Sequence, residues 1–189
     1  MHMNEINFVT SNRNKFEEIK LLGEKRGIKV NWLNQAKFEI QSYIIDSIAE
    51  LGAIAAFSAL LVPLIVEDTG LFIDSLNGFP GPYAAQVYKS VGLNGVLKLL
   101  EGARDRSARF ETVICYASES DLKLFKGVTK GTIANSISNG RNFGYDPIFI
   151  PEGKEKTLAE LGIDEKNKLS HRAKAFNAFA DYFLEKDSY

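Results

Sequence analysis

The chain has 189 residues, of which 45% are hydrophobic and 25% are charged, and its net charge at pH 7 is −1. This composition is typical of a folded globular protein, and the length suits a single domain over residues 1–189. The near-neutral charge argues against nucleic acid or an anionic membrane as a partner. A single cysteine, Cys115, excludes an internal disulfide and fits a reducing cytoplasm. The longest apolar run, residues 60–66, is too short to span a bilayer.

The first predicted elements are a strand over residues 6–10 and a helix from about 13 to 25. Three apolar residues at helical spacing mark one face of that helix: Phe16, Ile19 and Leu22. A strand, a polar turn and a helix together point N–H groups and a positive dipole end at an anion. Lys15 lies in the first helical turn, where a cation is easier to explain if an anion binds there. An ordinary capped helix with a solvated lysine is the alternative.

A second strand is predicted over residues 30–34 and a helix rich in small residues over 47–59. The apolar run that follows predicts a buried strand, which ends on Glu67 and Asp68. In open α/β sheets, ligands bind at the carboxyl ends of strands, and two carboxylates there can hold a divalent cation and activate a water. A strand end that turns into a solvated loop is the alternative. Glu39, considered alone, is a surface residue.

The second half of the chain predicts a tight turn over residues 77–83, a helix over 92–100 and a long β-hairpin from strands 107–117 and 122–134. A glycine-rich loop with two aromatic residues, Phe143 and Tyr145, then enters a short strand over 148–150. These aromatic rings either stack on a base or fold into the core, and the sequence leaves both readings open.

Residues 164–168 form a polar run that would normally be a solvated loop, and the last helix is predicted from about 171 to 186. Ser170 suits the N-cap of that helix. Lys166, His171 and Arg172 place three potential donors within seven residues, near the positive end of a helix dipole. A lone histidine at a helix start is usually structural or exposed to solvent, but this crowding of positive groups lacks an obvious structural purpose.

Six short motifs occur in the order and spacing found in the inosine/xanthosine triphosphate pyrophosphatases, and the chain resembles that family along nearly its whole length. The motifs are Phe-Val-Thr-Ser-Asn-Arg-Asn-Lys at 8–15, Glu-Ile-Gln at 39–41, Val-Glu-Asp-Thr-Gly-Leu at 66–71, Gly-Phe-Pro-Gly-Pro-Tyr at 78–83, Phe-Gly-Tyr-Asp-Pro at 143–147 and Glu-Lys-Asn-Lys-Leu-Ser-His-Arg at 165–172. Each motif is weak alone, but six in the right order are specific.

The resemblance implies an α/β fold with a mixed central sheet, flanking helices and two lobes around a nucleotide cleft. It implies a Mg²⁺-dependent homodimer in the cytoplasm that hydrolyses ITP, dITP and XTP to the nucleoside monophosphate and pyrophosphate. Nucleic acid and membrane are not among the implied partners.

The resemblance also assigns roles to residues of this chain. The triphosphate is cradled by Thr10, Ser11, Asn12, Arg13, Asn14 and Lys15. Magnesium is bound by Glu39 and Asp68 with Glu67 nearby, and Asp68 is the general base for water. The substrate also contacts Thr69, and the base and ribose are held by Phe143, Gly144, Tyr145 and Asp146. The pocket is completed by Lys166, His171 and Arg172, and donors from the last two would bond the 6-keto oxygen of the base.

Three other functions are compatible with parts of the sequence. A related enzyme acting on modified pyrimidine triphosphates would use the same phosphate chemistry. A nucleotide-binding module without catalysis would not need both Asp68 and Glu39. A nucleic-acid-binding protein would be expected to carry a basic stripe, which the sequence lacks.

Overall fold

The computed structural model describes residues 4–140 and 143–186. The chain forms two compact units, and neither is one continuous stretch of sequence. The first unit comprises the residues up to Asp68, the segment Thr112–Gly127 and the residues from Arg172 onward. The second unit comprises Thr69–Glu111 and Val128–His171.

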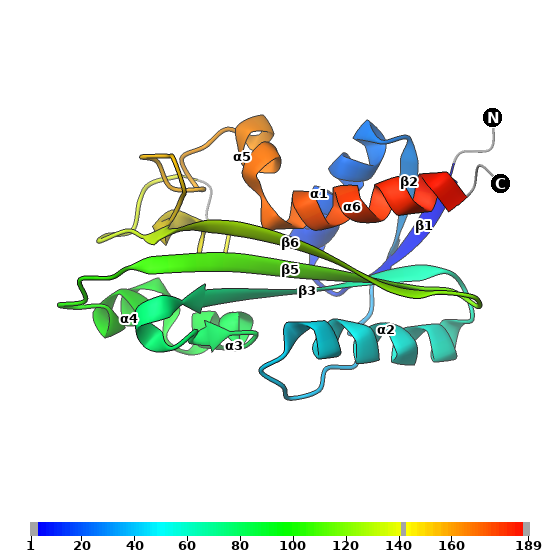
Figure 1. Cartoon of the computed structure of the whole chain (residues 1–189), viewed down its shortest axis with the longest axis horizontal. Helices are drawn as coiled ribbons and strands as arrows, with labels where there is room; N and C mark the ends of the chain where they lie inside the picture. Colours follow the sequence, from blue (N-terminus) through cyan, green and yellow to red (C-terminus); the bar gives the residue numbers. More distant parts are fainter. Residues whose placement is uncertain (1–3, 141–142, 187–189) are drawn as a thin grey trace. The chain divides into compact units, whose positions relative to one another are not determined.

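Strands and helices alternate in the first part of the chain and form a mixed sheet with flanking helices, which confirms the predicted fold class (Figure 1). The strands are β1 Asn4–Val9, β2 Ile28–Leu33, β3 Leu64–Ile73, β4 Pro80–Gly81, β5 Ser107–Ala117, β6 Leu122–Ile133 and β7 Phe149–Pro151. The helices are α1 Arg13–Lys25, α2 Ile45–Leu60, α3 Ala84–Ser90, α4 Gly92–Leu99, α5 Ile163–Leu169 and α6 His171–Lys186, with short 3₁₀ helices η1 Asp74–Leu76 and η2 Asp146–Ile148. Within the described residues the strand order is β2-β1-β3-β5-β6-β7, and β4 pairs with β3.

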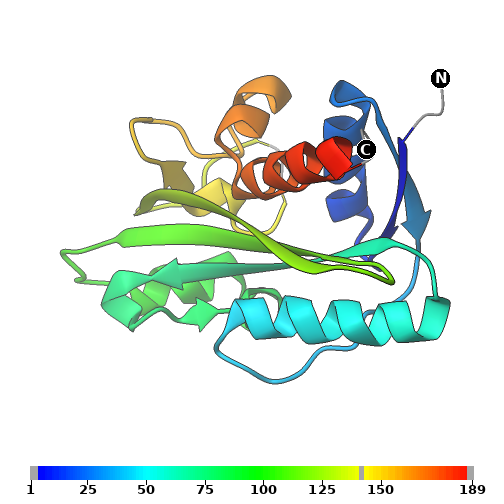
Figure 2. The same ribbon diagram turned by 45° about the vertical axis from the view of Figure 1, so that its right-hand side comes forward.

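The sheet of the first unit buries both of its faces. β1 runs parallel to β2 and β3, and side chains alternate between the faces along each strand. Ile65 packs in one cluster with α1 and α6, whereas its neighbours Leu64 and Val66 pack in another with α2. Figures 1 and 2 show α1 and α6 on one face and α2 on the other.

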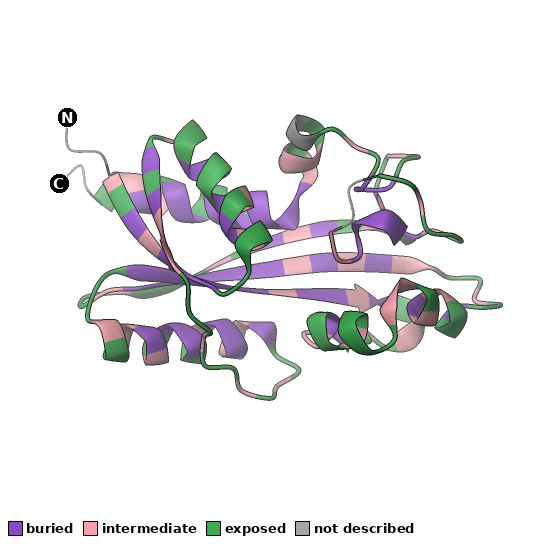
Figure 3. Cartoon of the chain, turned by 180° about the vertical axis from the view of Figure 1, so that it is seen from behind, coloured by how far each residue is buried: buried purple, intermediate pink, exposed green. Residues whose placement is uncertain are grey.

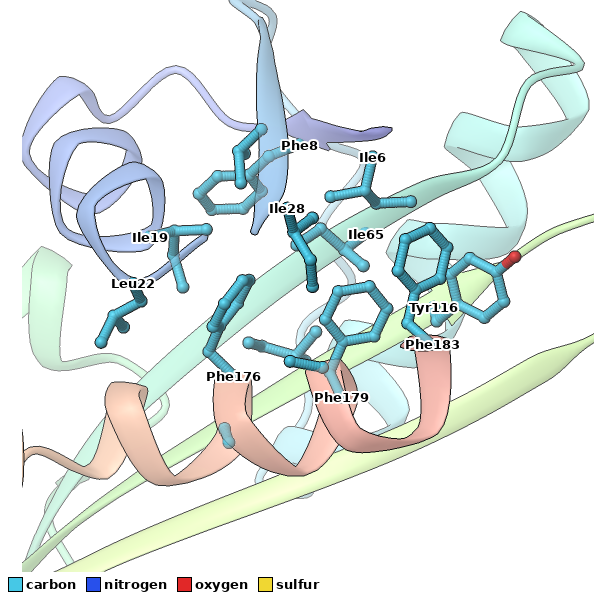
Figure 4. Packing of buried hydrophobic residues seen from close by; sticks show 14 of the residues in the cluster. Ile6, Phe8, Ile19, Leu22, Ile28, Ile65, Tyr116, Phe176, Phe179 and Phe183 are labelled. Carbon is cyan, nitrogen blue, oxygen red and sulfur yellow. The ribbon is translucent and has the colours of Figure 1, made fainter. Parts of the chain in front are cut away.

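The cluster under α1 and α6 is rich in phenylalanine. Figure 4 shows the α6 rings of Phe176, Phe179 and Phe183 converging with α1 and strand side chains, and all three are buried. The predicted apolar face of α1 is likewise buried against β2. On the opposite face, α2 buries residues three and four apart, with intermediate and exposed residues between them (Figure 3).

The second unit has its own core. Leu71 and Ile73 of β3, Val96 of α4 and Phe149 of β7 lie in one buried cluster. The long hairpin predicted from the sequence is confirmed, since β5 and β6 are neighbours joined by residues 118–121. Ser118 N donates to Asp121 O at 2.9 Å and closes the turn.

The prediction that the central strand ends at Asp68 is wrong, because β3 continues to Ile73. Leu71 and Phe72 pair with β4, which supplies the partner strand that the sequence did not reveal. Gly70 permits this approach, since a Cβ there would lie 2.9 Å from Gly81 O. Glu67 and Asp68 therefore lie within a strand.

Two other expectations about local structure needed the fold to settle them. The polar run 164–168 is not a loop, because it lies within helix α5. Of the two aromatic readings, the core reading holds for Tyr145, which is 5% exposed and donates its hydroxyl to Ala84 O at 2.8 Å. Phe143 is half-buried.

Candidate active site

Glu67 and Asp68 lie directly after the point where β3 stops pairing with β1. Val9 is the last β1 residue opposite β3, where it faces Val66. Because the two strands are parallel, the carboxyl end of β1 meets β3 at the two carboxylates. The rule that ligands bind at the carboxyl ends of parallel strands therefore still applies to this position, although β3 itself continues.

The turn between β1 and α1 is held by its own side chains. Thr10 Oγ1 accepts from Asn12 N at 3.1 Å, and Trp32 Nε1 donates to Thr10 O at 2.8 Å. Asn12 caps α1, because its Oδ1 accepts from Asn14 N at 3.1 Å and from Lys15 N at 3.2 Å. An anion at this end would therefore meet the helix dipole and exposed side chains rather than these two N–H groups. Four of the predicted phosphate-binding residues are exposed here: Ser11, Asn12, Arg13 and Asn14.

Glu67 is the centre of a buried ion-pair cluster in the first unit. Its side chain is fully buried, and Lys15 Nζ lies 2.6 Å from its Oε2. Arg172 Nη2 lies 3.1 Å from Glu67 Oε1, and Thr112 Oγ1 lies 3.4 Å from the same oxygen. Arg172 also donates to Glu18 Oε2. The predicted residues Lys15, Glu67 and Arg172 are thus brought together from three distant parts of the chain.

Asp68 contacts a residue that the sequence motifs do not include, Lys37. Lys37 Nζ lies 2.6 Å from Asp68 Oδ1 and 3.5 Å from Glu39 Oε1. The carboxylates of Asp68 and Glu39 are therefore close together, with one ammonium group against both. Burial raises the pKa of Asp68 above its usual value, and the positive charges of Lys37 and Lys15 oppose this shift.

The second unit holds a separate group of predicted residues. Lys166 Nζ lies 2.7 Å from Asp146 Oδ2 and 5.4 Å from the centre of the Phe143 ring. His171 is 5% exposed, and its ring stacks on Phe110 with centroids 4.6 Å apart. Gly144 has a φ of +54°, a conformation that glycine adopts easily. Thr69, the first residue of this unit, is half-buried.

The possible metal ligands are two or three carboxylates rather than a complete cage. Among residues 4–140 and 143–186, no group of three or more His, Cys, Asp or Glu side chains is arranged to hold a metal ion. Asp68 Oδ2 is buried, and none of the described residues hydrogen-bonds to it. A hard cation bound partly by water and ligand oxygens fits such a donor set.

The sequence analysis missed three residues of the first unit that contact the predicted site residues. Glu18 contacts Arg172, Thr112 contacts Glu67, and Lys37 contacts Asp68 and Glu39. A signal for Lys37 was present, because it precedes Glu39 by two positions and alternate residues of an extended chain lie on the same side. Glu18 and Thr112 carried no such signal, because each acts on a residue far away in the sequence.

Comparisons with known proteins agree with this arrangement of motifs. The model of the Ham1 family matches residues 6–182. A dITP/XTP pyrophosphatase from Saccharolobus solfataricus is 45% identical over 181 residues, which cover 96% of this chain and 94% of the relative. A dITP/XTP pyrophosphatase from Pyrococcus horikoshii is 45% identical over 178 residues, covering 94% and 96%. The structure of the Staphylococcus aureus Ham1 protein superposes with a TM-score of 0.84 at 29% identity, covering 97% of this chain and 100% of that one. No helix in the described part of the chain is long and apolar enough to cross a membrane. With a family model that spans most of its length and relatives at this level of identity, the chain belongs to the Ham1 family.

Proposed function

We propose that this chain hydrolyses the purine nucleoside triphosphates ITP, dITP and XTP to the monophosphate and pyrophosphate, with Mg²⁺ as its metal. Relatives named dITP/XTP pyrophosphatases, 45% identical over nearly the whole chain, support this function. The structural observation that carries it is the charged cluster of the first unit. Lys15 offers positive charge for phosphates, and Asp68 and Glu39 offer carboxylates for a cation.

Asp68 and Glu39 are the carboxylates best suited to hold the cation. Their oxygens lie against a single ammonium group, and Asp68 Oδ2 is buried with no hydrogen bond from the described residues. Both Glu67 oxygens already face Lys15 or Arg172, so in this proposal Glu67 positions those two cations and does not bind the metal. A bound magnesium ion would supply neutralisation of phosphate charge and a polarised water.

The protein groups around the phosphates supply the remaining chemistry. Asp68 accepts the proton of the attacking water, since it is buried next to the proposed cation site. Lys15 and the positive end of α1 offset negative charge on the leaving pyrophosphate. These groups are fixed before substrate binds, because Asn12 caps the helix and Glu67 holds Lys15.

The residues of the second unit are proposed to hold the base and ribose. Phe143 offers a half-buried ring, and Lys166 is fixed by Asp146 next to it. Tyr145 supports the loop from within the core and is not itself a stacking surface, because its hydroxyl is bonded to Ala84 O. His171 is proposed to donate a hydrogen bond to the 6-keto oxygen of the purine base.

A panel of nucleoside triphosphates tests the function directly. Purified protein with Mg²⁺ is incubated with ITP, dITP, XTP, ATP, GTP and modified pyrimidine triphosphates, and released pyrophosphate is measured. We expect the highest kcat/KM for ITP, dITP and XTP. A preference for pyrimidines would favour the related pyrimidine enzyme, and binding without pyrophosphate release would indicate a non-catalytic module.

Lys15→Ala is expected to lower kcat/KM for ITP by roughly 10- to 100-fold, the size of one hydrogen bond to a charged group. The loss of affinity should grow from mono- to di- to triphosphate ligands, because Lys15 is proposed to meet the β and γ phosphates. Steady-state kinetics and nucleotide binding by calorimetry measure both quantities.

Lys20→Ala is the matched control for Lys15→Ala. Lys20 lies on the same helix but is 46% exposed, and its ammonium lies 3.9 Å from Glu24 Oε1. This exposed pair contributes little, so the control should keep wild-type kinetics. If Lys15→Ala weakened the binding of all three ligands equally, the proposed contact with the outer phosphates would be wrong.

The resemblance to the pyrophosphatase family also supports a cytoplasmic homodimer as part of this proposal. Light scattering after size-exclusion chromatography measures the molar mass in solution. A single species of twice the 21.0 kDa chain mass is expected, and a monomer at micromolar concentration would contradict the dimer. Cell fractionation tests the location.

A further inference from the structure

Lys37 is the residue of the first unit whose placement the proposed reaction does not yet explain. Its side chain is 9% exposed, which is unusual for lysine, and it lies in the segment between β2 and α2. Among the described residues, its ammonium group contacts Asp68 and Glu39, the two carboxylates proposed to hold the metal. A buried lysine at this position needs a reason beyond surface solvation.

The neighbouring helix lets the backbone next to Lys37 approach closely. Gly52 of α2 has no Cβ, and a Cβ added there would lie 3.1 Å from Phe38 O and 3.7 Å from Lys37 Cδ. The absent side chain at Gly52 allows the segment that carries Lys37 to lie close to α2. The aliphatic part of Lys37 is therefore packed, while its charged end reaches the carboxylates.

The ammonium lies where a divalent cation would be expected. Asp68 Oδ1 at 2.6 Å and Glu39 Oε1 at 3.5 Å both face Lys37 Nζ, so one positive charge serves two carboxylates. A metal ion bound by the same two side chains needs the same oxygens. Two cations so close together would repel each other strongly in a partly buried site.

We propose that Lys37 is an internal cation, which holds Asp68 and Glu39 together before the metal binds and is displaced from them when it does. This inference rests on the proposed cation site at Asp68 and Glu39. Lys37 is then a positioning residue that compensates the charges of buried Asp68 and half-exposed Glu39 in the metal-free protein. Its removal exposes the carboxylates to the metal without competition.

Direct metal binding tests this proposal without using activity. Wild-type protein and Lys37→Met are titrated with Mn²⁺ in the absence of nucleotide, and free Mn²⁺ is followed by electron paramagnetic resonance. Lys37→Met is expected to bind Mn²⁺ roughly 10- to 100-fold more tightly, because binding no longer breaks a charge-assisted hydrogen bond. Its melting temperature without metal should be lower than that of wild type and should rise more on adding Mn²⁺.

Two further variants make the result specific. Lys37→Arg keeps the positive charge, so its Mn²⁺ affinity should stay near that of wild type. Lys29→Met removes an exposed lysine of the same unit, paired with Glu5 at 2.9 Å, and should leave Mn²⁺ affinity unchanged. If Lys37→Met is poorly folded, the Mn²⁺ affinities of Lys37→Arg, wild type and Asp68→Asn are compared instead. Lys37→Arg should bind Mn²⁺ as wild type does, and Asp68→Asn must bind it more weakly.

Weaker or unchanged Mn²⁺ binding by folded Lys37→Met would overturn the proposal, as would the absence of Mn²⁺ binding by both wild type and Lys37→Met. Pyrophosphate release from ITP by the wild-type protein is measured separately. Active wild type with no gain of Mn²⁺ affinity in Lys37→Met refutes the role of Lys37 alone. Inactive wild type refutes the proposed function, whichever way the Mn²⁺ titration turns out.

Discussion

Asp68→Asn is expected to lower kcat for ITP hydrolysis by roughly 10²–10⁴-fold at saturating Mg²⁺, the usual contribution of a general base. Asparagine is nearly isosteric with aspartate, but its amide cannot take a proton from water and is a weaker metal ligand. The loss of kcat is expected to come from the site itself. Asp68 is 8% exposed, and one of its oxygens is buried without a hydrogen bond from the described residues. Steady-state kinetics with ITP, followed by pyrophosphate release, measures the change.

The control for Asp68→Asn is the same substitution at Asp74. Asp74 begins η1, directly after β3, and its side chain is 54% exposed, with Arg109 Nη1 at 3.5 Å. Asp74→Asn should retain wild-type kcat. Circular dichroism should show that both variants are folded. A folded Asp68→Asn variant with wild-type kcat would remove Asp68 from the general-base role.

The sequence predicted best those elements whose apolar spacing is regular. The faces of α1 and α6 are buried as expected because phenylalanine and aliphatic residues recur there every three or four positions. Helix α5 was missed for the opposite reason, since a run of charged residues has no apolar face from which a helix can be read. The end of β3 was misplaced because Gly70 resembles a turn residue until the close approach of Gly81 in β4 is known.

The candidate site was predictable in its residue types but not in its pairings. The motifs singled out Lys15, Glu67 and Arg172, yet the contact between the last two joins residues 105 positions apart. Local spacing carries no information about such a pair. Lys37 lies outside the quoted motifs, and only the fold shows that its side chain turns inward to Asp68.

Arg172 is the residue for which the contacts change the expectation most. The resemblance placed Arg172 in the nucleotide pocket, and the chemistry of the base predicted that its guanidinium donates to the 6-keto oxygen. In the structure the side chain is 4% exposed, and its guanidinium faces Glu67 Oε1 at 3.1 Å and Glu18 Oε2. A guanidinium held by two carboxylates is already directed to them, so its first expected role is to compensate buried Glu67.

Arg172→Ala is therefore expected to lower the free energy of unfolding by about 3–5 kcal/mol, the usual cost of removing one partner of a buried ion pair. The fully buried carboxylate of Glu67 would then face Lys15 with half of its compensation lost. Urea denaturation followed by circular dichroism measures the change. Arg26→Ala is the control, because Arg26 is 30% exposed and its pairing with Asp181 lies at the surface, where such pairs contribute at most about 1 kcal/mol.

A double variant separates lost compensation from lost packing. Glu67→Met combined with Arg172→Met removes both charges while keeping side-chain volume, and it should recover part of the stability that Arg172→Ala loses, since Lys15 and Glu18 each lose one ion-pair partner. The ratio of kcat/KM for ITP over ATP, measured on Arg172→Ala at a temperature where it is folded, decides between the two roles. We expect this ratio to stay near the wild-type value while both activities fall. Without Arg172 the Glu67 side chain is held less firmly, so it positions Lys15 less well. If the ratio fell toward one in a variant of wild-type stability, Arg172 would be assigned to recognition of the purine base. Lys15 alone would then have to compensate the charge of Glu67.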